Sequence, residues 1–495
     1  IPYVFRATND NLFRYLGRNM LSFGWEIKGI LVTLPEILKI MQKMKIFRHS
    51  FIALCAMLAT VAIVFTSCEN DDEDNQLRVE LKNAPAIAQF DYGQTHSFEV
   101  SMKKEHSYEI EEVPEGWKAE LPSKTLLKVT APAKGVGETS GVVKISVHRK
   151  ERTVSAQLKV EIMPATTIAQ NANSYIISQP NTRYKIKATV KGNSSQSIGG
   201  TPISAEVVWQ TSKDLLGPVM LDGDHISFTT TADANDDTKI NEGNALIAVK
   251  DANETILWSW HLWLTDYNPE EDNITYPDGS VMMDRNLGAM SDGSDDLYRA
   301  YGLFYQWGRK DPLIMSANAT STSNASTYNN LNNNIGFSPV ECDEEIGTLE
   351  YAIKCPTRII KGVEASGYDW LYKAHDASLW AANKTMYDPC PAGWKVPDSK
   401  VWNSVQESTD GEFESGWYFN FGGTTTFYPA AGRRSFSKGV LTNTNHDGTL
   451  WTGYYWSANS TSNDKSVGFY FNRDTFDTAQ ANYRAGGFQV RCVKE

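Results

Sequence analysis

The stretch Val154-Ser155-Ala156-Gln157-Leu158-Lys159-Val160-Glu161-Ile162 alternates apolar and polar residues. Side chains of a β-strand point alternately to the two faces of a sheet, so this period of two predicts a half-buried strand. Similar short runs recur through residues 77–164, and turn residues such as Pro114-Glu115-Gly116 separate them. The pattern predicts an immunoglobulin-like β-sandwich over residues 77–164, with Trp117 in its core.

A second β-sandwich module is expected over residues 165–268. Tyr184 and Ile186 alternate with lysines, which indicates a strand with one solvent-exposed face. The apolar run at residues 245–249 predicts a strand that is buried on both faces. Further along, Trp258, Trp260 and Trp263 lie within six residues. They suit either a sugar-stacking platform or core and inter-domain packing, and we favour packing.

Beyond residue 268 the chain is rich in Gly, Asn, Ser and aromatic residues and has few long apolar runs. Apolar spacing predicts a helix over residues 295–307, and Asp398 is the expected N-cap of another with Val401, Trp402 and Val405 facing inward. Short strands and turns are expected to follow. The fold class is therefore multidomain and mainly β, with two β-sandwich modules followed by an α+β domain.

The 495 residues carry a formal net charge of −12. An acidic chain without a basic stripe repels phosphate backbones, so nucleic acid is not an expected partner. The histidines and cysteines show no spacing typical of a metal site. The acidic loop at residues 233–237 partly imitates a calcium loop, but it lacks the sixth-position glycine, and a solvated turn is expected. We expect neither a metal nor a cofactor.

The segment 44–67 has the pattern of a bacterial lipoprotein signal peptide. Lys45 and Arg48 precede the apolar run from Phe51 to Phe65, and small residues lead to Cys68. Cys68 is then the lipidation site. About fifteen apolar residues are few for a permanent membrane helix, which is the alternative.

Residues 68–76 form an acidic stretch that is expected to be an extended tether. An acidic cluster after the acylated cysteine is similar to the export signal of Bacteroidota surface lipoproteins, which implies a lipid-anchored protein exposed outside the outer membrane. A plain linker facing the periplasm is the alternative. Residues 1–43 precede the signal, and we interpret them as a mis-called upstream extension.

Four cysteines remain in the C-terminal half, and an even number in an exported domain is typical of disulfides. Three pairings are possible. We favour Cys390 with Cys492, which would tie the end of the domain to its middle, and Cys342 with Cys355.

Six motifs in the C-terminal half resemble, in order, the Fibrobacter succinogenes major paralogous domain. They are Asp284-Arg285-Asn286-Leu287-Gly288-Ala289, the run from Gly302 to Pro312, the run from Tyr387 to Pro397, Tyr428-Pro429-Ala430-Ala431-Gly432, Tyr455-Trp456-Ser457 and Val490-Arg491-Cys492-Val493. The unit before them looks like the β-module of fimbrillin-like Bacteroidota lipoproteins.

The resemblance extends over residues 269–495 and implies a C-type-lectin-like fold, in which a small sheet and two helices support a loop-rich ligand face. The calcium signatures of sugar-binding C-type lectins are absent from the sequence. No spacing singles out a general acid and base. The resemblance concerns the scaffold and does not by itself fix a function.

The expected ligand face combines aromatic rings, which give rigid contact area, with polar groups that give directional hydrogen bonds. Its candidate residues are Asn443, Asn445, Asp447, Trp451, Tyr454, Tyr455, Asn459, Asn472, Arg473 and Asp474. The alternative is that the aromatic residues are core and the amides cap turns. Arg433 or Arg434 is a candidate partner in a buried ion pair.

Together these features predict a non-catalytic surface lipoprotein that binds a glycan or protein through its C-terminal domain, as in adhesion. An accessory or tip subunit of a fimbria-like assembly, with fimbrial subunits as partners, is the alternative. An enzyme that acts on glycans is a third, less favoured hypothesis.

Overall fold

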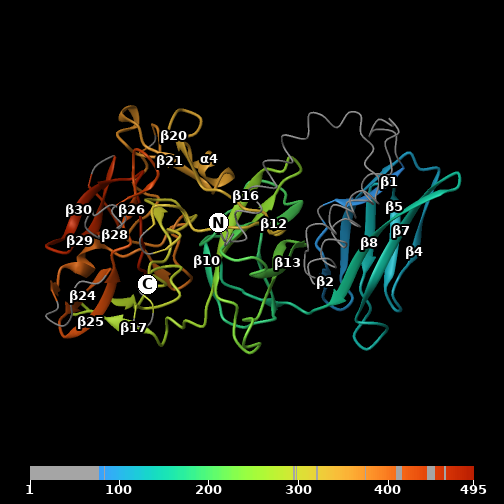
Figure 1. The fold of residues 1–495 in the computed structure, drawn as a ribbon, viewed down its shortest axis with the longest axis horizontal. Helices are drawn as coiled ribbons and strands as arrows, with labels where there is room; N and C mark the ends of the chain where they lie inside the picture. Colours follow the sequence, from blue (N-terminus) through green and yellow to red (C-terminus); the bar gives the residue numbers. More distant parts are fainter. Residues whose placement is uncertain are drawn as a thin grey trace, which may run out of the picture. The chain divides into compact units, whose positions relative to one another are not determined.

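The computed structural model describes residues 77–82, 84–293, 296, 298–318, 321–373, 375–407, 415–442, 452–461 and 464–495. Leu77–Glu495 form one compact unit (Figure 1). The leader, the tether and Cys68 lie outside the described residues. Within the described ranges no helix is long and apolar enough to span a membrane.

The first module is a β-sandwich of two four-stranded sheets. One sheet has the order β1 (Arg78–Lys82), β3 (Thr95–Lys103), β6 (Leu126–Thr130), β5 (Lys118–Ser123). The other has the order β2 (Ala88–Phe90), β8 (Arg152–Ile162), β7 (Ser140–Arg149), β4 (Ser107–Glu112). Figure 1 shows these strands in blue and teal.

The core of this sandwich lies between the two sheets, as the alternating pattern predicts. Leu158 and Val160 on β8 are buried, whereas Val154 near the β7–β8 turn stays exposed. Trp117 is buried, its ring packs edge-on against Phe90, and its indole N–H donates to the Glu138 carbonyl at 2.8 Å. The prediction that Trp117 is a core residue is confirmed.

The second module also has two four-stranded sheets. One has the order β10 (Ser174–Ile177), β16 (Ile256–Leu264), β15 (Gly243–Lys250), β12 (Ser204–Gln210). The other has the order β13 (Leu216–Asp222), β14 (His225–Thr230), β11 (Arg183–Lys187), β9 (Thr166–Thr167). Strand β15 is buried on both faces, as its apolar run predicts.

The three tryptophans of β16 are packing residues, because all of them are buried. The indole N–H of Trp263 donates to the carbonyl of Ala289 at 3.1 Å, and the ring of Trp258 lies 6.1 Å from that of Tyr387. Both partners belong to the C-terminal domain. The Trp-rich strand therefore joins the second module to that domain, and the sugar-stacking alternative is wrong for these residues.

The C-terminal domain, here called the head (residues 269–495), is α+β and is built from short sheets. Two of them are four-stranded: β17 (Asn273–Thr275), β18 (Val281–Met283), β32 (Val493–Lys494), β22 (Trp394–Lys395); and β19 (Tyr305–Gln306), β31 (Gly487–Phe488), β26 (Arg433–Arg434), β27 (Leu441–Thr442).

Smaller sheets and short helices complete the described part of the head. The sheets are β28 (Thr452–Ser460), β29 (Lys465–Asn472), β30 (Phe476–Tyr483); β23 (Val405–Glu407), β24 (Gly416–Phe421), β25 (Thr424–Pro429); and β20 (Ser338–Glu341) with β21 (Arg358–Lys361). The helices are α4 (Leu349–Lys354) and the 3-10 turns η2 (Glu364–Ser366) and η3 (Ser399–Trp402).

One of the two predicted helices forms in part, as a 3-10 turn that ends at Trp402 with Val405 already in β23, and the other does not form. The Asp398 carboxylate accepts the Lys400 N–H at 2.9 Å and caps η3, whose Val401 and Trp402 are buried. The described part of residues 295–307 is instead a turn that leads into β19. Gly302 explains the difference, because its φ of +67° interrupts a helix and an added Cβ would lie 2.7 Å from the Leu287 carbonyl oxygen.

The shared motifs form the skeleton of the head. The Asn286 side chain donates to the Tyr301 carbonyl and to the Tyr455 hydroxyl, and its Oδ1 accepts from the Arg491 guanidinium at 3.2 Å. Arg491 also donates to the carbonyl of Phe427 at 2.8 Å. Residues more than 200 positions apart are thus locked together in the core, which explains why these motif positions need polar side chains of fixed shape.

One of the two favoured disulfides is present. Cys390 and Cys492 are bonded across a sequence separation of 102 residues. The predicted pair of Cys342 and Cys355 is wrong, because both are free cysteines. The Cys342 thiol at the end of β20 lies 3.2 Å from the Trp370 carbonyl oxygen, whereas Cys355 is the C-cap of α4.

Candidate functional site

The predicted ligand face divides into residues that the structure describes and residues that it does not. Asn443, Asn445, Asp447 and Trp451 lie outside the described residues. The six others lie on or beside the sheet β28–β29–β30.

Tyr455 is a core residue and is not open to a ligand. Its side chain is fully buried, and its hydroxyl donates to the Pro429 carbonyl at 2.8 Å. Tyr454 is 6% exposed, and its ring packs against those of Tyr470 and Phe488. The assignment of Tyr454 and Tyr455 to the ligand face is therefore wrong, because β28 is buried at every position from Thr452 to Ala458.

The asparagines of the predicted face cap turns. Asn459 accepts the Ser399 N–H at 2.7 Å and donates to Asp398, which fixes the start of η3. The Oδ1 of Asn472 accepts the backbone N–H groups of Asp474 and Thr475 in the β29–β30 turn. Arg473 and Asp474 are exposed on that turn. The alternative that the amides cap turns is thus correct for Asn459 and Asn472.

A hollow of about 150 Å³ lies beside this sheet, and we call it the cation pocket. Its lining residues come from β26, β29, β30 and β31 and the turns next to them. They are Arg433, Arg434, Phe436, Lys465, Ala481, Asn482, Tyr483, Gly486 and Phe488. Three of the nine are cationic and none is acidic, in a chain whose net charge is −12.

Two cations of the pocket are held by aromatic rings. The Arg433 guanidinium carbon lies 4.8 Å from the centroid of the Tyr454 ring, and the Lys465 ammonium lies 4.7 Å from that of Tyr483. A cation over a ring face is attracted by the ring quadrupole and keeps its full charge. Among the described residues, no carboxylate forms an ion pair with either side chain, and the Arg433 Nε is a buried nitrogen without a hydrogen-bond partner.

Arg434 has a structural role. It is 1% exposed, and its guanidinium donates to the Ile314 carbonyl and, at 2.9 Å, to the Asn324 side chain. Burial lowers the pKa of Arg434 to about 9. The expected buried ion pair at Arg433 or Arg434 does not form in the described part of the head, because carbonyl and amide oxygens take the place of a carboxylate.

Aromatic residues form the wall of the pocket beside Lys465. The ring centroids of Phe436 and Tyr483 are 4.7 Å apart, and Tyr368 packs against both at 5.1 and 5.0 Å. The Phe436 carbonyl accepts the Gly362 N–H at 2.7 Å, which anchors the loop after β26. The half-buried Phe436 and Tyr483 rings are therefore fixed in place before any ligand arrives.

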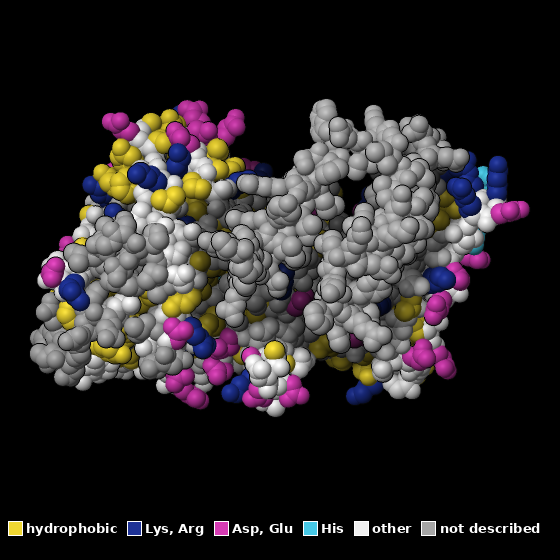
Figure 2. Space-filling model, viewed as in Figure 1, with side chains coloured by type: hydrophobic (Ala, Val, Ile, Leu, Met, Phe, Trp, Pro, Cys, Tyr) yellow, Lys and Arg dark blue, Asp and Glu magenta, His cyan; other side chains and the backbone are white. Residues whose placement is uncertain are grey.

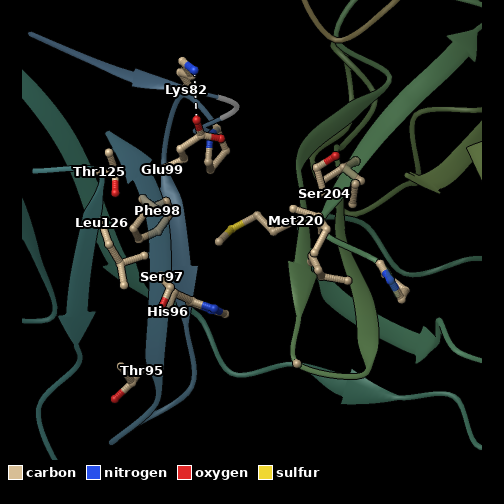
Figure 3. Close-up of a pocket in the computed structure, with 17 residues that line it drawn as sticks. Lys82, Thr95, His96, Ser97, Phe98, Glu99, Thr125, Leu126, Ser204 and Met220 are labelled. Atoms are coloured by element: carbon tan, nitrogen blue, oxygen red, sulfur yellow. Dashed lines mark hydrogen bonds and ion pairs between the residues drawn. The ribbon is translucent and has the colours of Figure 1, made fainter. Parts of the chain in front are cut away.

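A larger cleft of about 560 Å³ lies between the first and second modules. Figure 3 shows Met220 reaching from the β13–β14 hairpin toward Phe98 of β3, and Lys82 paired with Glu99. Met220 is 5% exposed and belongs to the core of the first module. The charged groups of this cleft thus pair with each other, and its Met220 is a packing residue, which is typical of a joint between modules.

The joint between these modules also contains a buried ion pair. The Arg183 side chain is fully buried and donates to Asp222 at 2.9 Å, and it lies 3.5 Å from Asp91 of the first module. Asp91 further pairs with Lys185 at 3.1 Å. Every cation here has an acidic partner, in contrast to the cation pocket.

An apolar hollow of about 380 Å³ lies on the head beside α4, lined partly by Leu349, Leu371, Tyr372 and Leu379. Its cation, Lys373, pairs with Glu344. In Figure 2, acidic side chains gather in several groups over the visible face, with basic ones among them. No three described His, Cys, Asp or Glu side chains are grouped closely enough to hold a metal ion.

The sequence does not mark Lys465 and Tyr483 as site residues, because each is a single charged or aromatic residue in an ordinary strand. Arg433 was singled out, but for a buried ion pair. What marks these residues is their contact across strands. Arg433 of β26 lies over a ring of β28, and Lys465 of β29 lies over a ring of β30.

No protein-family model and no curated protein matches the chain. Among solved structures it is similar to a chimeric titin fragment, with 13% identity over 38% of this chain and 96% of that chain and a TM-score of 0.14. Tandem immunoglobulin repeats of Dlar give 14% identity, 38% and 98% coverage, and a TM-score of 0.16.

An endo-fucoidan hydrolase of glycoside hydrolase family 107 gives 11% identity, 38% and 34% coverage, and a TM-score of 0.16. Likeness at these scores indicates neither a family nor an activity for this chain. The chain itself is a multidomain, mainly β protein with immunoglobulin-like sandwich modules.

Proposed function

We propose that the chain is a non-catalytic ligand-binding lipoprotein, anchored in the outer membrane through acylated Cys68 and exposed at the cell surface. The head would bind a glycan or a protein, and the two sandwich modules would carry it. The observation that supports this function most is the cation pocket, where Arg433 and Lys465 lie over aromatic rings and, among the described residues, pair with no carboxylate.

The motif residues of the head support a scaffold role. Gln306 illustrates this, because its amide donates to the carbonyls of Ile360 and Ala485 and its oxygen accepts from Arg309 at 2.7 Å. The Asp388 carboxylate accepts the backbone N–H groups of Cys390 and Val396, both at 2.9 Å. Polar groups that are already satisfied in the core have little left to offer a substrate, so recognition belongs elsewhere on the head.

The joint between the second module and the head supports a carrier role for the sandwiches. The Lys310 ammonium donates to Ser259 and Asp311, each at 2.6 Å, and lies 4.4 Å from the Trp258 ring centroid. The Asn173 amide donates to the carbonyls of Met386 and Asp388. A joint with this many buried polar contacts resists rotation, so a load on the head would pass to the second module.

Ligand binding is tested with the full chain in detergent micelles on a glycan array and on immobilised extracellular-matrix proteins. We expect binding to some of these probes and loss of at least tenfold in affinity in Tyr483→Ala. The matched control is Tyr108→Ala, since Tyr108 is 40% exposed on the first module. Absence of binding to every probe would contradict the proposal, and co-purification with pilin-like subunits instead would favour the fimbrial alternative.

The anchor is tested separately by feeding cells an alkyne-labelled fatty acid. We expect label in the wild-type chain and none in Cys68→Ala, together with protease sensitivity of the wild type on intact cells. Label that persists in Cys68→Ala would contradict lipidation at this residue.

A further inference from the structure

We propose that the cation pocket binds the anionic group, a carboxylate or a sulfate, of an acidic saccharide. This inference rests on the proposed function, that the head binds a ligand, and it names the chemical class. The anion would lie between Arg433 and Lys465, and the sugar ring would lie against the wall formed by Phe436 and Tyr483.

The first argument is charge balance. The buried cations of this acidic chain have acidic or carbonyl partners: Arg183 pairs with Asp222, Lys310 pairs with Asp311, and Arg434 donates to the Ile314 carbonyl. Arg433 and Lys465 share one pocket that no carboxylate lines, and among the described residues they contact only rings through their charged groups. Two like charges in one small hollow repel each other, and a bound anion removes that repulsion.

The second argument is preorganisation. The Tyr454 and Tyr483 rings hold the two cations without neutralising them, and both rings are packed by other aromatic residues. A ligand that meets side chains already in place loses less conformational entropy on binding. Arg433 offers a planar fork that matches a carboxylate or sulfate, whereas Lys465 supplies a point charge.

The third argument is size and wall chemistry, which favour a saccharide over an acidic peptide. A hollow of about 150 Å³ suits one anionic group and is smaller than the sites that enclose whole drug-sized ligands. The rest of the ligand must therefore lie along the rim, where half-buried Phe436 and Tyr483 offer flat apolar surface. The apolar face of a sugar ring packs on such a surface, and Asn482 adds an amide for its hydroxyl groups.

The test measures binding of the full chain, in detergent micelles, to four probes: polygalacturonate, dextran sulfate, neutral dextran and polyglutamate. We expect binding to at least one of the two acidic polysaccharides and at least tenfold weaker binding to neutral dextran and polyglutamate. Affinity should fall as salt is raised. The polygalacturonate and dextran sulfate arms distinguish a carboxylate from a sulfate as the source of the charge.

Arg433→Met and Lys465→Met should each weaken binding to the acidic polysaccharide at least tenfold, and Arg433→Lys should recover part of the loss. The matched control is Lys438→Met, which removes an exposed cation of the same head that does not line the pocket. Equal loss in Lys438→Met would show that net charge alone is responsible and would overturn the inference.

Two other outcomes separate this inference from the proposed function. Binding to neutral dextran that the pocket variants do not change, or stronger binding to polyglutamate than to either polysaccharide, would overturn the acidic-saccharide assignment and leave ligand binding by the head intact. Failure to bind these four probes and every glycan and matrix protein tested above would overturn the proposed function itself.

Discussion

The core of the head and the cation pocket both contain arginine and lysine side chains, but they use them differently. In the core, Arg491 donates to Asn286, Thr426 and Phe427 and lies 3.8 Å from the Tyr428 ring centroid. In the pocket, the charged group of Arg433 contacts the Tyr454 ring and, among the described residues, no carboxylate.

The difference separates cations that hold the fold together from cations that are available to a ligand. A buried guanidinium stabilises a fold only when its donors are satisfied, because an unpaired buried donor costs about 1–3 kcal/mol. A half-buried cation on a ring contributes little to the fold, about 0.5–1 kcal/mol at exposed sites. The following predictions, from the largest expected effect on stability to the smallest, test this separation.

Loss of the disulfide should have the largest effect. Replacing Cys390 and Cys492 by Ala removes a link that spans 102 residues, and a loop of about 100 residues corresponds to about 4.7 kcal/mol in the chain-entropy description. In urea unfolding, the free energy of unfolding of the head should fall by several kcal/mol. The control Cys355→Ala removes a free thiol and should cost less than about 1 kcal/mol. A similar loss in both would contradict the assignment of Cys355.

Removal of the core cation should come next. Arg491→Met leaves the buried Asn286 oxygen and the Phe427 carbonyl without their donor, which we expect to cost about 3 kcal/mol or more in the free energy of unfolding. Urea unfolding followed by tryptophan fluorescence measures this. Lys438→Met, the exposed control, should change stability by less than about 0.5 kcal/mol. A loss below about 1 kcal/mol for Arg491→Met would show that the core tolerates a missing cation.

His261 gives a pH-dependent prediction of intermediate size. It is buried between Ser174 and Asn244, whose side chains lie 3.0 and 2.9 Å from its two ring nitrogens, and burial lowers its pKa to about 3 from an ordinary value of 6.5. Below pH 6.5 the unfolded chain binds a proton that the folded chain refuses. Stability should therefore fall as pH drops from 6.5 toward 3, by up to about 1.4 kcal/mol per pH unit.

The His261 effect must be read as a difference from a variant, because other buried groups titrate in the same range. Burial raises the pKa of Asp388 to about 6, so the folded chain binds its proton first and that contribution to stability grows as pH falls from 6 toward 3.8. Subtracting the curve of His261→Gln from that of the wild type isolates the histidine. A difference that does not change between pH 6.5 and 4 would contradict a neutral buried His261.

The pocket cations should have the smallest effect on stability. Arg433→Met and Lys465→Met remove ring contacts and no ion pair, so each should change the free energy of unfolding by less than about 1 kcal/mol. Urea unfolding beside Arg491→Met checks this. A loss as large as that of Arg491→Met would make Arg433 or Lys465 a structural residue and would weaken the case for a binding site.

Local patterns in the sequence predict much of the fold. The alternation at residues 154–162 and the apolar run at residues 245–249 predict strands β8 and β15, because each pattern depends on nearest neighbours in one strand. Helix N-caps favour side chains with a hydroxyl, amide or carboxyl oxygen, and this preference predicts the cap at Asp398. The helix expected over residues 295–307 fails because a glycine with positive φ and a distant strand, β31, override the apolar spacing.

The candidate site could be predicted only in part. The sequence points to the region after residue 440, and Lys465 and Tyr483 lie there. Of the predicted residues that the structure describes, however, Asn459 and Asn472 cap turns and Tyr454 and Tyr455 are buried. Whether a tyrosine on β28 faces the core or a pocket depends on the register of three strands, and a cation is uncompensated only when no acid from any other element approaches it. Both properties depend on residues that are distant in the sequence, so they cannot be predicted from composition and residue spacing.

The most direct test is a crystal structure of the full chain, in detergent, soaked with a galacturonate oligosaccharide. If Arg433 and Lys465 are ligand cations, a galacturonate carboxylate should lie about 2.7–2.9 Å from the Arg433 guanidinium and from the Lys465 ammonium, with the sugar ring against Tyr483. A saccharide bound elsewhere on the head, with the cation pocket empty, would contradict the assignment of these cations to recognition.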